Sequence, residues 1–261
     1  MYTNADQLTS AKKEELLLNI SNLKPDIVAI CEMKPKNGKE RTEIDYQIPD
    51  FNTRFVNLLS GTGRGISIYI HSSLEQVVEE ISVDNGYNEA CLLKIHLHNQ
   101  DQLLFGCVYR SPSTSATSGI NDEKLNKLLS DLSNRNYSHV CLVGDFNFKD
   151  INWKTWSTSK SEQSKEHRFL ETLRDCYLFQ HVSEPTRARG TDEPSLLDLI
   201  ITNEEMQVSD IQYISPLGKS DHSVICFKYN CYLNVTKHRH ESFSYNKADY
   251  DAMRKYLTDV D

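Results

Sequence analysis

The sequence lacks any apolar run close to the length of a membrane-spanning helix. Such a helix needs about 20 consecutive apolar residues, and every apolar run here is far shorter. The first residues also lack a basic segment followed by an apolar core, which is the pattern of a secretory signal. We therefore expect an intracellular protein without a membrane partner. No targeting signal is found, and a nuclear location is compatible with this expectation.

The cysteines lack the spacing of a structural zinc site. The chain has seven cysteines, an odd number, and contains no C-x-x-C pair. Cys31, Cys107, Cys141 and Cys226 all lie inside apolar, strand-like runs. We therefore interpret them as small buried thiols in a reducing compartment.

A net positive charge is also missing. The 261-residue chain carries a net charge of −8, which argues against a protein that coats nucleic acid by bulk electrostatics. An enzyme that meets phosphate groups through a metal cation and a few local arginines is still compatible with this charge. Acidic metal-binding residues would themselves contribute to the negative balance.

Strand-like and helix-like segments alternate over most of the chain. Several strand-like segments follow one another without a helix between them, which indicates mixed sheets and excludes a purely parallel one. The leucines at 125, 128, 129 and 132 form a helical stripe, with Asn121-Asp122 as its expected N-terminal cap. Helices are expected near residues 9–23, along the leucine stripe that follows Asn121-Asp122, and around Phe169, Leu170 and Leu173. Strands are expected near residues 26–31, 65–70, 90–97, 103–109, 139–145, 196–202, 207–214 and 223–229.

Oxygen-bearing side chains lie at the ends of these apolar runs, where burying a carboxylate is costly unless a partner or a function requires it there. Glu32 follows the run that ends at Cys31, and Asn4 and Asp6 lie two residues apart just before a helix. Hard oxygen ligands hold Mg²⁺, which takes only one or two protein carboxylates. Glu32 is thus the expected first metal ligand, with Asn4 and Asp6 completing or orienting its surroundings.

A second group suits the hydrolysis of a phosphate ester. Asp145 could polarise the attacking water while Asn147 holds a phosphate oxygen or that water. His222 could donate to the phosphate or accept a proton, and it needs a carboxylate to fix its ring. Asp198 lies inside an apolar run, where a carboxylate is costly unless it is paired. Asp198 is therefore the expected partner of His222.

Together, the motifs that carry these residues resemble the endonuclease/exonuclease/phosphatase superfamily, the fold of deoxyribonuclease I and of the abasic-site endonucleases. Within it, the chain looks most like the endonuclease domain of non-LTR (LINE-type) retrotransposons, especially the jockey-like branch. The ordered motifs are N-A-D at residues 4–6, C-E-x-K at 31–34, V-Y-R-x-P at 108–112, G-D-F-N at 144–147, P-T-R at 185–187, L-L-D-L-I-I-T at 196–202 and S-D-H at 220–222.

The resemblance implies an α/β four-layer sandwich, in which two mixed β-sheets pack face to face with helices outside. It implies an endonuclease that nicks DNA with Mg²⁺, or alternatively Mn²⁺, as cofactor. Residues 1–230 would form this domain, and residues 231–261 a tail that connects to a reverse transcriptase domain in a longer parent protein. The roles carried over are metal binding for Asn4, Asp6, Glu32 and Asp221, catalysis for Tyr109, Asp145, Asn147, Asp198 and His222, and substrate binding for Arg110, Thr186 and Arg187.

Several alternatives remain open on the sequence. The fold also suits a phosphomonoesterase acting on an inositol phosphate or a nucleotide, and a domesticated copy could bind nucleic acid without cutting it. Only three residues precede Asn4, whereas the family begins with a full apolar strand, so a shortened or missing first strand is expected. Trp153 and Trp156 could stack on bases or pack against the body of the protein. The sequence carries no signal for oligomeric state.

Overall fold

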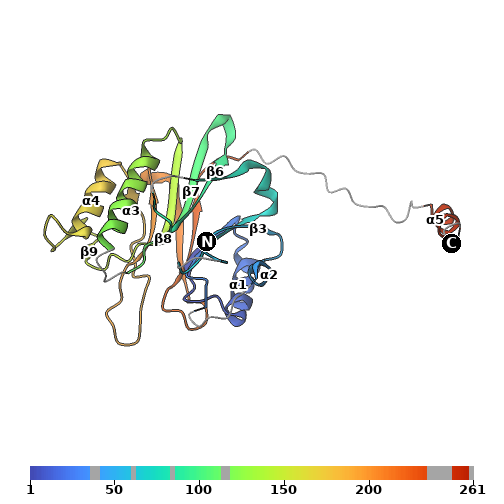
Figure 1. Ribbon diagram of the computed structural model, residues 1–261, viewed down its shortest axis with the longest axis horizontal. Coiled ribbons are helices and arrows are strands. Elements are labelled where there is room, and N and C mark those ends of the chain that lie inside the picture. Colours follow the sequence, from blue (N-terminus) through green and yellow to red (C-terminus); the bar gives the residue numbers. More distant parts are fainter. Residues whose placement is uncertain (36–41, 60–62, 83–85, 113–117, 234–248, 259–261) are drawn as a thin grey trace.

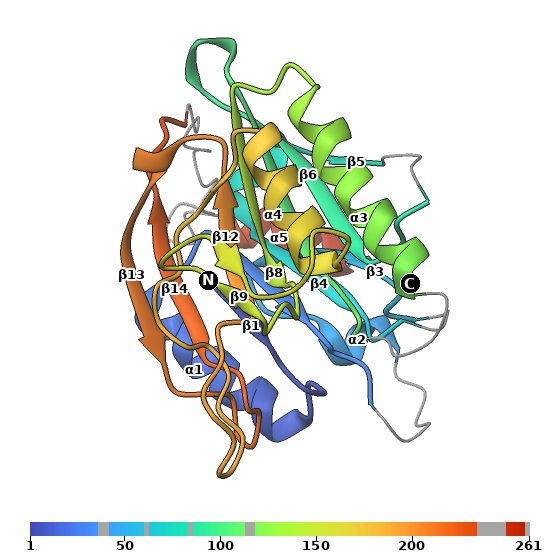
Figure 2. The same ribbon diagram turned by 90° about the vertical axis from the view of Figure 1, so that its left-hand side faces the viewer.

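The computed structural model describes residues 1–35, 42–59, 63–82, 86–112, 118–233 and 249–258. In this part of the chain, two six-stranded sheets lie face to face. Helices cover the outer side of each sheet, α1 on one and α3 with α4 on the other (Figure 1; Figure 2). The predicted four-layer sandwich is therefore confirmed.

The first sheet has the strand order β13-β14-β1-β2-β4-β3. β1 and β2 run parallel, with Asn4 opposite Cys31, and β14 lies antiparallel to β1 on the other side. This sheet is thus mixed, as the sequence predicted. Its strands are β1 (Tyr2–Asn4), β2 (Ile27–Cys31), β3 (Phe51–Val56), β4 (Ile66–His71), β13 (Val208–Ile214) and β14 (Val224–Tyr229).

The second sheet has the order β11-β12-β8-β7-β6-β5 and is also mixed, because β7 and β8 run parallel while their neighbours are antiparallel. Gly144 is required where β7 and β8 meet, since a Cβ at this position would lie 1.9 Å from the carbonyl oxygen of Val108. The strands are β5 (Val78–Ile81), β6 (Ala90–His96), β7 (Gln102–Tyr109), β8 (His139–Asp145), β11 (Phe179–Gln180) and β12 (Asp198–Thr202).

Three apolar cores hold the four layers together. One fills the space between the sheets, a second lies between the second sheet and helices α3 and α4, and a third lies between α1 and the first sheet. Leu16 of α1 and Leu125 of α3 are fully buried, as their helical stripes predict. The main helices are α1 (Ser10–Leu23), α3 (Ser118–Ser133) and α4 (Lys165–Asp175).

The remaining described elements are short. They are α2 (Glu43–Tyr46), the 3₁₀ turns at Ser72–Val77, His98–Gln100 and Glu205–Gln207, the small hairpin of β9 (Ile151–Asn152) with β10 (Ser157–Thr158), and α5 (Tyr250–Thr258). The strands β3 and β5 have no counterpart in the sequence-based expectation. Both are edge strands of their sheets, and their mixed polar and apolar residues give a weak strand signal. None of the described helices has the length and apolarity needed to cross a membrane.

Two expectations need correction. The first strand is short but present, because β1 is hydrogen-bonded between β14 and β2 and the amino group of Met1 donates to the Ile27 carbonyl. Helix α3 begins at Ser118, so Asn121 and Asp122 lie inside the helix and do not cap it. Asp122 is instead buried and paired with Arg110 at 2.6 Å.

Candidate active site

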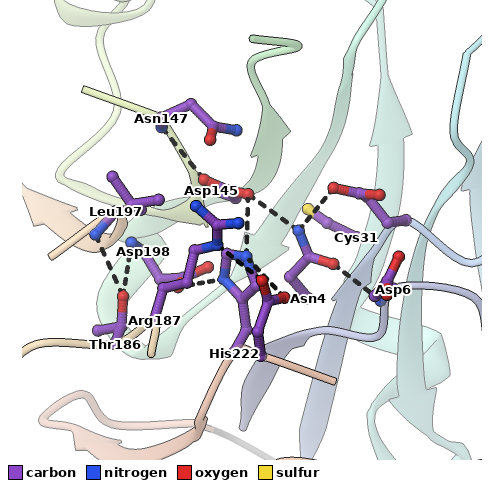
Figure 3. A network of polar contacts seen from close by, with 12 residues as sticks. Asn4, Asp6, Cys31, Asp145, Asn147, Thr186, Arg187, Leu197, Asp198 and His222 are labelled. Atoms are coloured by element: carbon purple, nitrogen blue, oxygen red, sulfur yellow. Dashed lines mark hydrogen bonds and ion pairs between the residues drawn. The ribbon is translucent and has the colours of Figure 1, made fainter. Parts of the chain in front are cut away.

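The motif residues meet at one end of the sandwich, where β1, β2, β7 and β8 end and where β12 and β14 begin. A cleft of about 1570 Å³ opens there. Its lining includes Asp6, Glu32, Asp145, Asn147 and His222. Residues that are far apart in the sequence thus share one pocket, and Figure 3 shows the polar network at its floor.

Asn4 links the two sheets at the centre of this network. Its side-chain amide nitrogen donates to Glu32 Oε1 at 3.0 Å and to Asp145 Oδ2 at 2.9 Å (Figure 3). Its amide oxygen accepts a hydrogen bond from the backbone of Asp6 at 2.9 Å. Because Asn4 is fully buried, it fixes the relative positions of the two carboxylates. This geometry favours the orienting role that the sequence allowed for Asn4.

The backbone at the cleft adopts conformations that side chains other than glycine rarely take. Asp6, Glu32 and Asn147 have φ angles of 38°, 51° and 53°. Left-handed backbone at such residues costs free energy and persists where the surrounding structure holds it. Here hydrogen bonds do so: Gln7 N donates to the Glu32 carbonyl at 2.7 Å, and Asn147 N donates to Asp145 Oδ1 at 3.1 Å.

Glu32 receives hydrogen bonds on both carboxylate oxygens. Tyr109 donates its hydroxyl to Oε1 at 3.0 Å, and Arg64 donates Nε to Oε2 at 3.0 Å. Arg64 Nη2 also lies 3.8 Å from Asp6 Oδ1. Burial, with the adjacent Glu32 charge, raises the pKa of Tyr109, so its hydroxyl stays protonated and able to donate.

His222 and Asp198 form the expected pair. His222 Nδ1 lies 2.7 Å from Asp198 Oδ2, and both side chains are buried. The other oxygen of Asp198 accepts a hydrogen bond from the Tyr2 hydroxyl at 2.9 Å. The second ring nitrogen of His222 points toward Asp145, with Nε2 3.9 Å from Oδ2. The ring is therefore held from one side and presents its other nitrogen to the Asp145 carboxylate (Figure 3).

The two ionisable groups facing each other have shifted pKa values. Burial, reinforced by the nearby Asp198 charge, raises the pKa of Asp145 to about 8, although His222 and Asn4 oppose the shift. Burial alone would lower the pKa of His222, but the attraction and hydrogen bond of Asp198 outweigh it and raise that pKa to about 10. His222 is thus a cation over most of the neutral range, suited to hydrogen-bonding an anionic phosphate.

The chemistry of the side chains fits a divalent cation. Asp6 and Glu32 are oxygen donors on the same cleft wall, and Glu32 keeps 17% of its side chain exposed. Asp221 lines the same cleft. Asp145, Asp198 and His222 also have ligand atoms within 4.8 Å of one another. In that second group, however, His222 Nδ1 already bonds Asp198 and the residues are almost fully buried, so the Glu32 group suits a hydrated Mg²⁺ better.

Arg110, predicted to bind substrate, has its guanidinium engaged by other parts of the protein. Its side chain is 1% exposed. The guanidinium pairs with Asp122, donates to the carbonyls of Phe146 and Asn147 at 3.3 and 3.1 Å, and stacks 4.1 Å from the centre of the Phe148 ring. These contacts connect the loop that follows Asp145 to helix α3 through Arg110. Arg110 also belongs to the cleft lining, so its substrate role stays a prediction.

Thr186, also predicted to lie on the substrate side, is buried as well. The residue is 1% exposed, and its hydroxyl accepts hydrogen bonds from the backbone nitrogens of Leu197 and Asp198 at 3.2 and 3.0 Å (Figure 3). Thr186 therefore fixes the start of β12 and with it the Asp198 side chain. The adjacent Arg187 does line the cleft and pairs with Asp221 at 2.9 Å. Although partial burial opposes it, this hydrogen bond lowers the pKa of Asp221.

The tryptophans follow the packing interpretation. Trp153 contacts Trp156 and Phe169 edge-on, with ring centres 5.5 and 6.4 Å apart, and both tryptophans pack on the core under α4. The cleft lining contains basic side chains among acidic ones such as Asp150, Glu184 and Asp192. The basic residues lining the cleft rim are Lys149, Lys154, Lys165, Arg187, Arg189 and Lys219.

Three contributors to the site were missed at the sequence level. Tyr2 bonds Asp198, Arg64 bonds Glu32, and the Ser220 hydroxyl donates to the Asn4 carbonyl at 2.9 Å while accepting from His222 N. The alternation of a strand places Tyr2 on the same face as Asn4, and that signal was available. No local pattern pointed to Arg64.

Comparisons with known proteins agree with this geometry. Residues 103–226 match the model of a family described as endonuclease-reverse transcriptase. The endonuclease domain of TRAS1, a telomere-specific non-LTR retrotransposon, superposes with a TM-score of 0.61 at 14% identity, covering 88% of this chain and 97% of that one. No curated protein matches the chain significantly.

Two other solved structures share the architecture. The 3′ phosphatase NExo from Neisseria, bound to a product DNA hairpin, has a TM-score of 0.62 at 15% identity and covers 88% of this chain and 98% of its own. The Xenopus laevis APE2 catalytic domain has a TM-score of 0.58 at 13% identity, with coverages of 90% and 94%. At these identities the likeness establishes the fold, and the resemblance predicted from the motifs is confirmed.

Proposed function

We propose that this chain, which has the deoxyribonuclease I-like fold of the endonuclease/exonuclease/phosphatase superfamily and resembles the endonucleases of non-LTR retrotransposons, is a divalent-metal-dependent endonuclease that nicks DNA. The observation that carries the proposal is the convergence of Glu32, Asp145 and His222 in one cleft, where Asn4 joins the two carboxylates and buried Asp198 holds the histidine. These residues come from both sheets, and a purely structural role does not explain why so many ionisable groups share one pocket.

The side chains divide the work of hydrolysis among themselves. Asp145, held by Asn4 and by the backbone of Asn147, orients the attacking water and accepts its proton. His222, fixed by Asp198, donates from Nε2 to a phosphate oxygen. The hydroxyl of Tyr109 holds the Glu32 carboxylate. The side-chain amide of Asn147 bonds the Arg110 carbonyl through one N–H and has a second N–H to offer the phosphate.

Glu32 and Asp6 would hold the cation, with Asn4 and Asp221 beside them. When bound, Mg²⁺ or Mn²⁺ supplies positive charge that neutralises the phosphate and stabilises the leaving oxygen. Asp145 can act as a base only when it is ionised, and positive charge in the cleft favours that form because it opposes the repulsion from Asp198.

A polymeric substrate suits the cleft better than a small one. The cleft is about 1570 Å³ in volume and has basic residues along its rim, so a chain of phosphates can contact the rim while one of them reaches the floor. A phosphomonoesterase is the second candidate, because one of the similar structures is a 3′ phosphatase. We also propose that residues 231–261 connect this domain to a reverse transcriptase in a longer protein.

The test is nicking of supercoiled plasmid by the purified wild type with Mg²⁺, with EDTA, and by Asp145→Ala and His222→Ala. His96→Ala is the matched control, because this histidine is exposed and pairs with Glu79 away from the cleft. We expect nicking only by the wild type and the control, and only with metal. Equal nicking in every sample, or in none, contradicts the proposal. A parallel panel with 3′-phosphorylated oligonucleotides and inositol phosphates separates the phosphomonoesterase, and DNA binding without turnover identifies a binding remnant.

A further inference from the structure

Tyr2 makes a contact that the catalytic scheme above does not use. Its hydroxyl donates to Asp198 Oδ1 at 2.9 Å, and both side chains are fully buried. The two residues are 196 positions apart in the chain and belong to different sheets, Tyr2 to β1 and Asp198 to β12. The bond therefore crosses the space between the sheets directly behind the catalytic histidine.

The register of the strands explains why this contact forms. Tyr2 and Asn4 are two residues apart on β1, so their side chains leave the same face of the first sheet. On the facing sheet, Asp198 and Asp145 are directly opposite one another on β12 and β8. Tyr2 donates to Asp198, and Asn4 donates to Asp145. One strand thus carries two donors that match a pair of carboxylates on the other sheet.

The two hydrogen bonds to Asp198 are made on different oxygens. Tyr2 binds Oδ1, and His222 Nδ1 binds Oδ2. A buried carboxylate that lost one of these donors would have an oxygen without a partner and could turn within its pocket. Such a turn would change the direction of the His222 ring, because Asp198 is the group that fixes Nδ1.

From this arrangement we infer that Tyr2 is a positioning residue of the reaction, which acts through Asp198 to hold His222 toward Asp145. The inference rests on the proposed function, since it assigns Tyr2 a part in that same site. Burial, together with the Asp198 charge, raises the pKa of Tyr2, so the phenol remains a donor throughout the working pH range.

A matched control is available in the same sheet. Tyr69 on β4 is also fully buried and donates its hydroxyl to the backbone carbonyl of Tyr46 at 2.8 Å, in the core beneath α1. Tyr69→Phe removes a buried phenol hydroxyl of the same type without touching the site. Comparing Tyr2→Phe with Tyr69→Phe therefore separates loss of one core hydrogen bond from loss of the Asp198 contact.

The experiment measures kcat and KM for nicking, and the proton NMR resonance of the His222 Nδ1–H, assigned by its disappearance in His222→Gln. A hydrogen bond to a charged group corresponds to a decrease in kcat on the order of tenfold to a hundredfold for Tyr2→Phe. We expect KM to stay within about twofold because Tyr2 is buried behind the site. The resonance should shift in Tyr2→Phe and keep its position in Tyr69→Phe. Equal kcat for the two variants, or an unmoved resonance, overturns the inference.

A double variant gives a second, independent measure. Because the phenol acts through Asp198, Tyr2→Phe combined with Asp198→Asn should lose no more kcat than Asp198→Asn alone. Fully additive losses contradict that coupling. If the wild type does not nick DNA at all, the proposed function falls, and the His222 resonance in Tyr2→Phe alone then decides the inference.

Discussion

Asp145 and Asp198 face each other on adjacent antiparallel strands, β8 and β12, as a directly opposed pair. Two carboxylates in this position repel one another, and burial adds to the cost. The structure offsets the cost with four hydrogen-bond donors: Asn4 and the backbone of Asn147 for Asp145, and Tyr2 and His222 for Asp198. The stability of the site therefore depends on protonation.

The first prediction concerns pH. His222 has its pKa raised from 6.5 to about 10, so its attraction to Asp198 stabilises the fold fully below pH 6.5 and is lost as pH rises through 10. The raised pKa of Asp145, about 8, acts in the same direction, because ionisation costs the folded state more than the unfolded one. In EDTA, urea unfolding should give wild type a free energy of unfolding that falls by on the order of 3 kcal/mol between pH 6 and pH 10.

His222→Gln isolates the histidine contribution to this change. The stability difference between wild type and His222→Gln should shrink as pH rises over the same range, since the variant has no charge to lose. A difference that stays constant from pH 6 to pH 10 would show that His222 is not held as a cation by Asp198.

The second prediction concerns Arg64. Its guanidinium contacts Glu32 and approaches Asp6, and its Nη2 atom is buried without a hydrogen-bond partner among the described residues. A divalent cation on these carboxylates lies near this positive charge and is repelled by it. Arg64→Gln should therefore bind Mn²⁺ several-fold more tightly in calorimetric titration. Arg168→Gln, on the exposed side of α4, serves as the control; equal affinity in both variants would refute the idea.

The third prediction concerns Arg110 and Asp122. Removing one partner of a buried ion pair costs about 3–5 kcal/mol, because the other charge remains buried. Asp122→Asn should therefore lower Tm clearly and reduce nicking, since Arg110 also holds the Phe146 and Asn147 carbonyls. Lys127→Gln is the control variant, because the ion pair of Lys127 with Asp131 on the same helix is exposed. Such a pair contributes at most about 0.5 kcal/mol to stability. Similar Tm values for both variants would contradict this account.

The fourth prediction concerns Gly144. A methyl group at this position would overlap the Val108 carbonyl at 1.9 Å, so Gly144→Ala must push β7 and β8 apart and displace Asp145. We expect a loss of more than about 3 kcal/mol in unfolding free energy, measured by urea denaturation. Gly119→Ala has open space around the new methyl group and lies in helix α3, so it should be neutral or stabilising. If Gly144→Ala had the wild-type free energy of unfolding, β7 and β8 would be able to move apart without cost, which would contradict this account.

The sequence was most informative where a polar residue ended an apolar run. Glu32, Asp145 and Asp198 were recognisable because a carboxylate in such a place is costly without a partner, and the structure supplies partners for each. The motifs could not show that the Arg110 and Thr186 side chains are buried, because a motif gives the order of residues but not the direction of their side chains. Asp122 looked like a helix cap, since its true partner, Arg110, is 12 residues away and no local pattern connects them.

Residues from the two ends of the described body meet in the first sheet, where Tyr2 pairs with Ile225. The amino-terminal strand can take its place between neighbours only after β14 has left the ribosome, and His222 arrives at the same moment. A partly synthesised chain therefore has neither a closed first sheet nor the His222–Asp198 pair. Under the proposed function, such a chain would lack the group that contacts the phosphate until the whole body has been made.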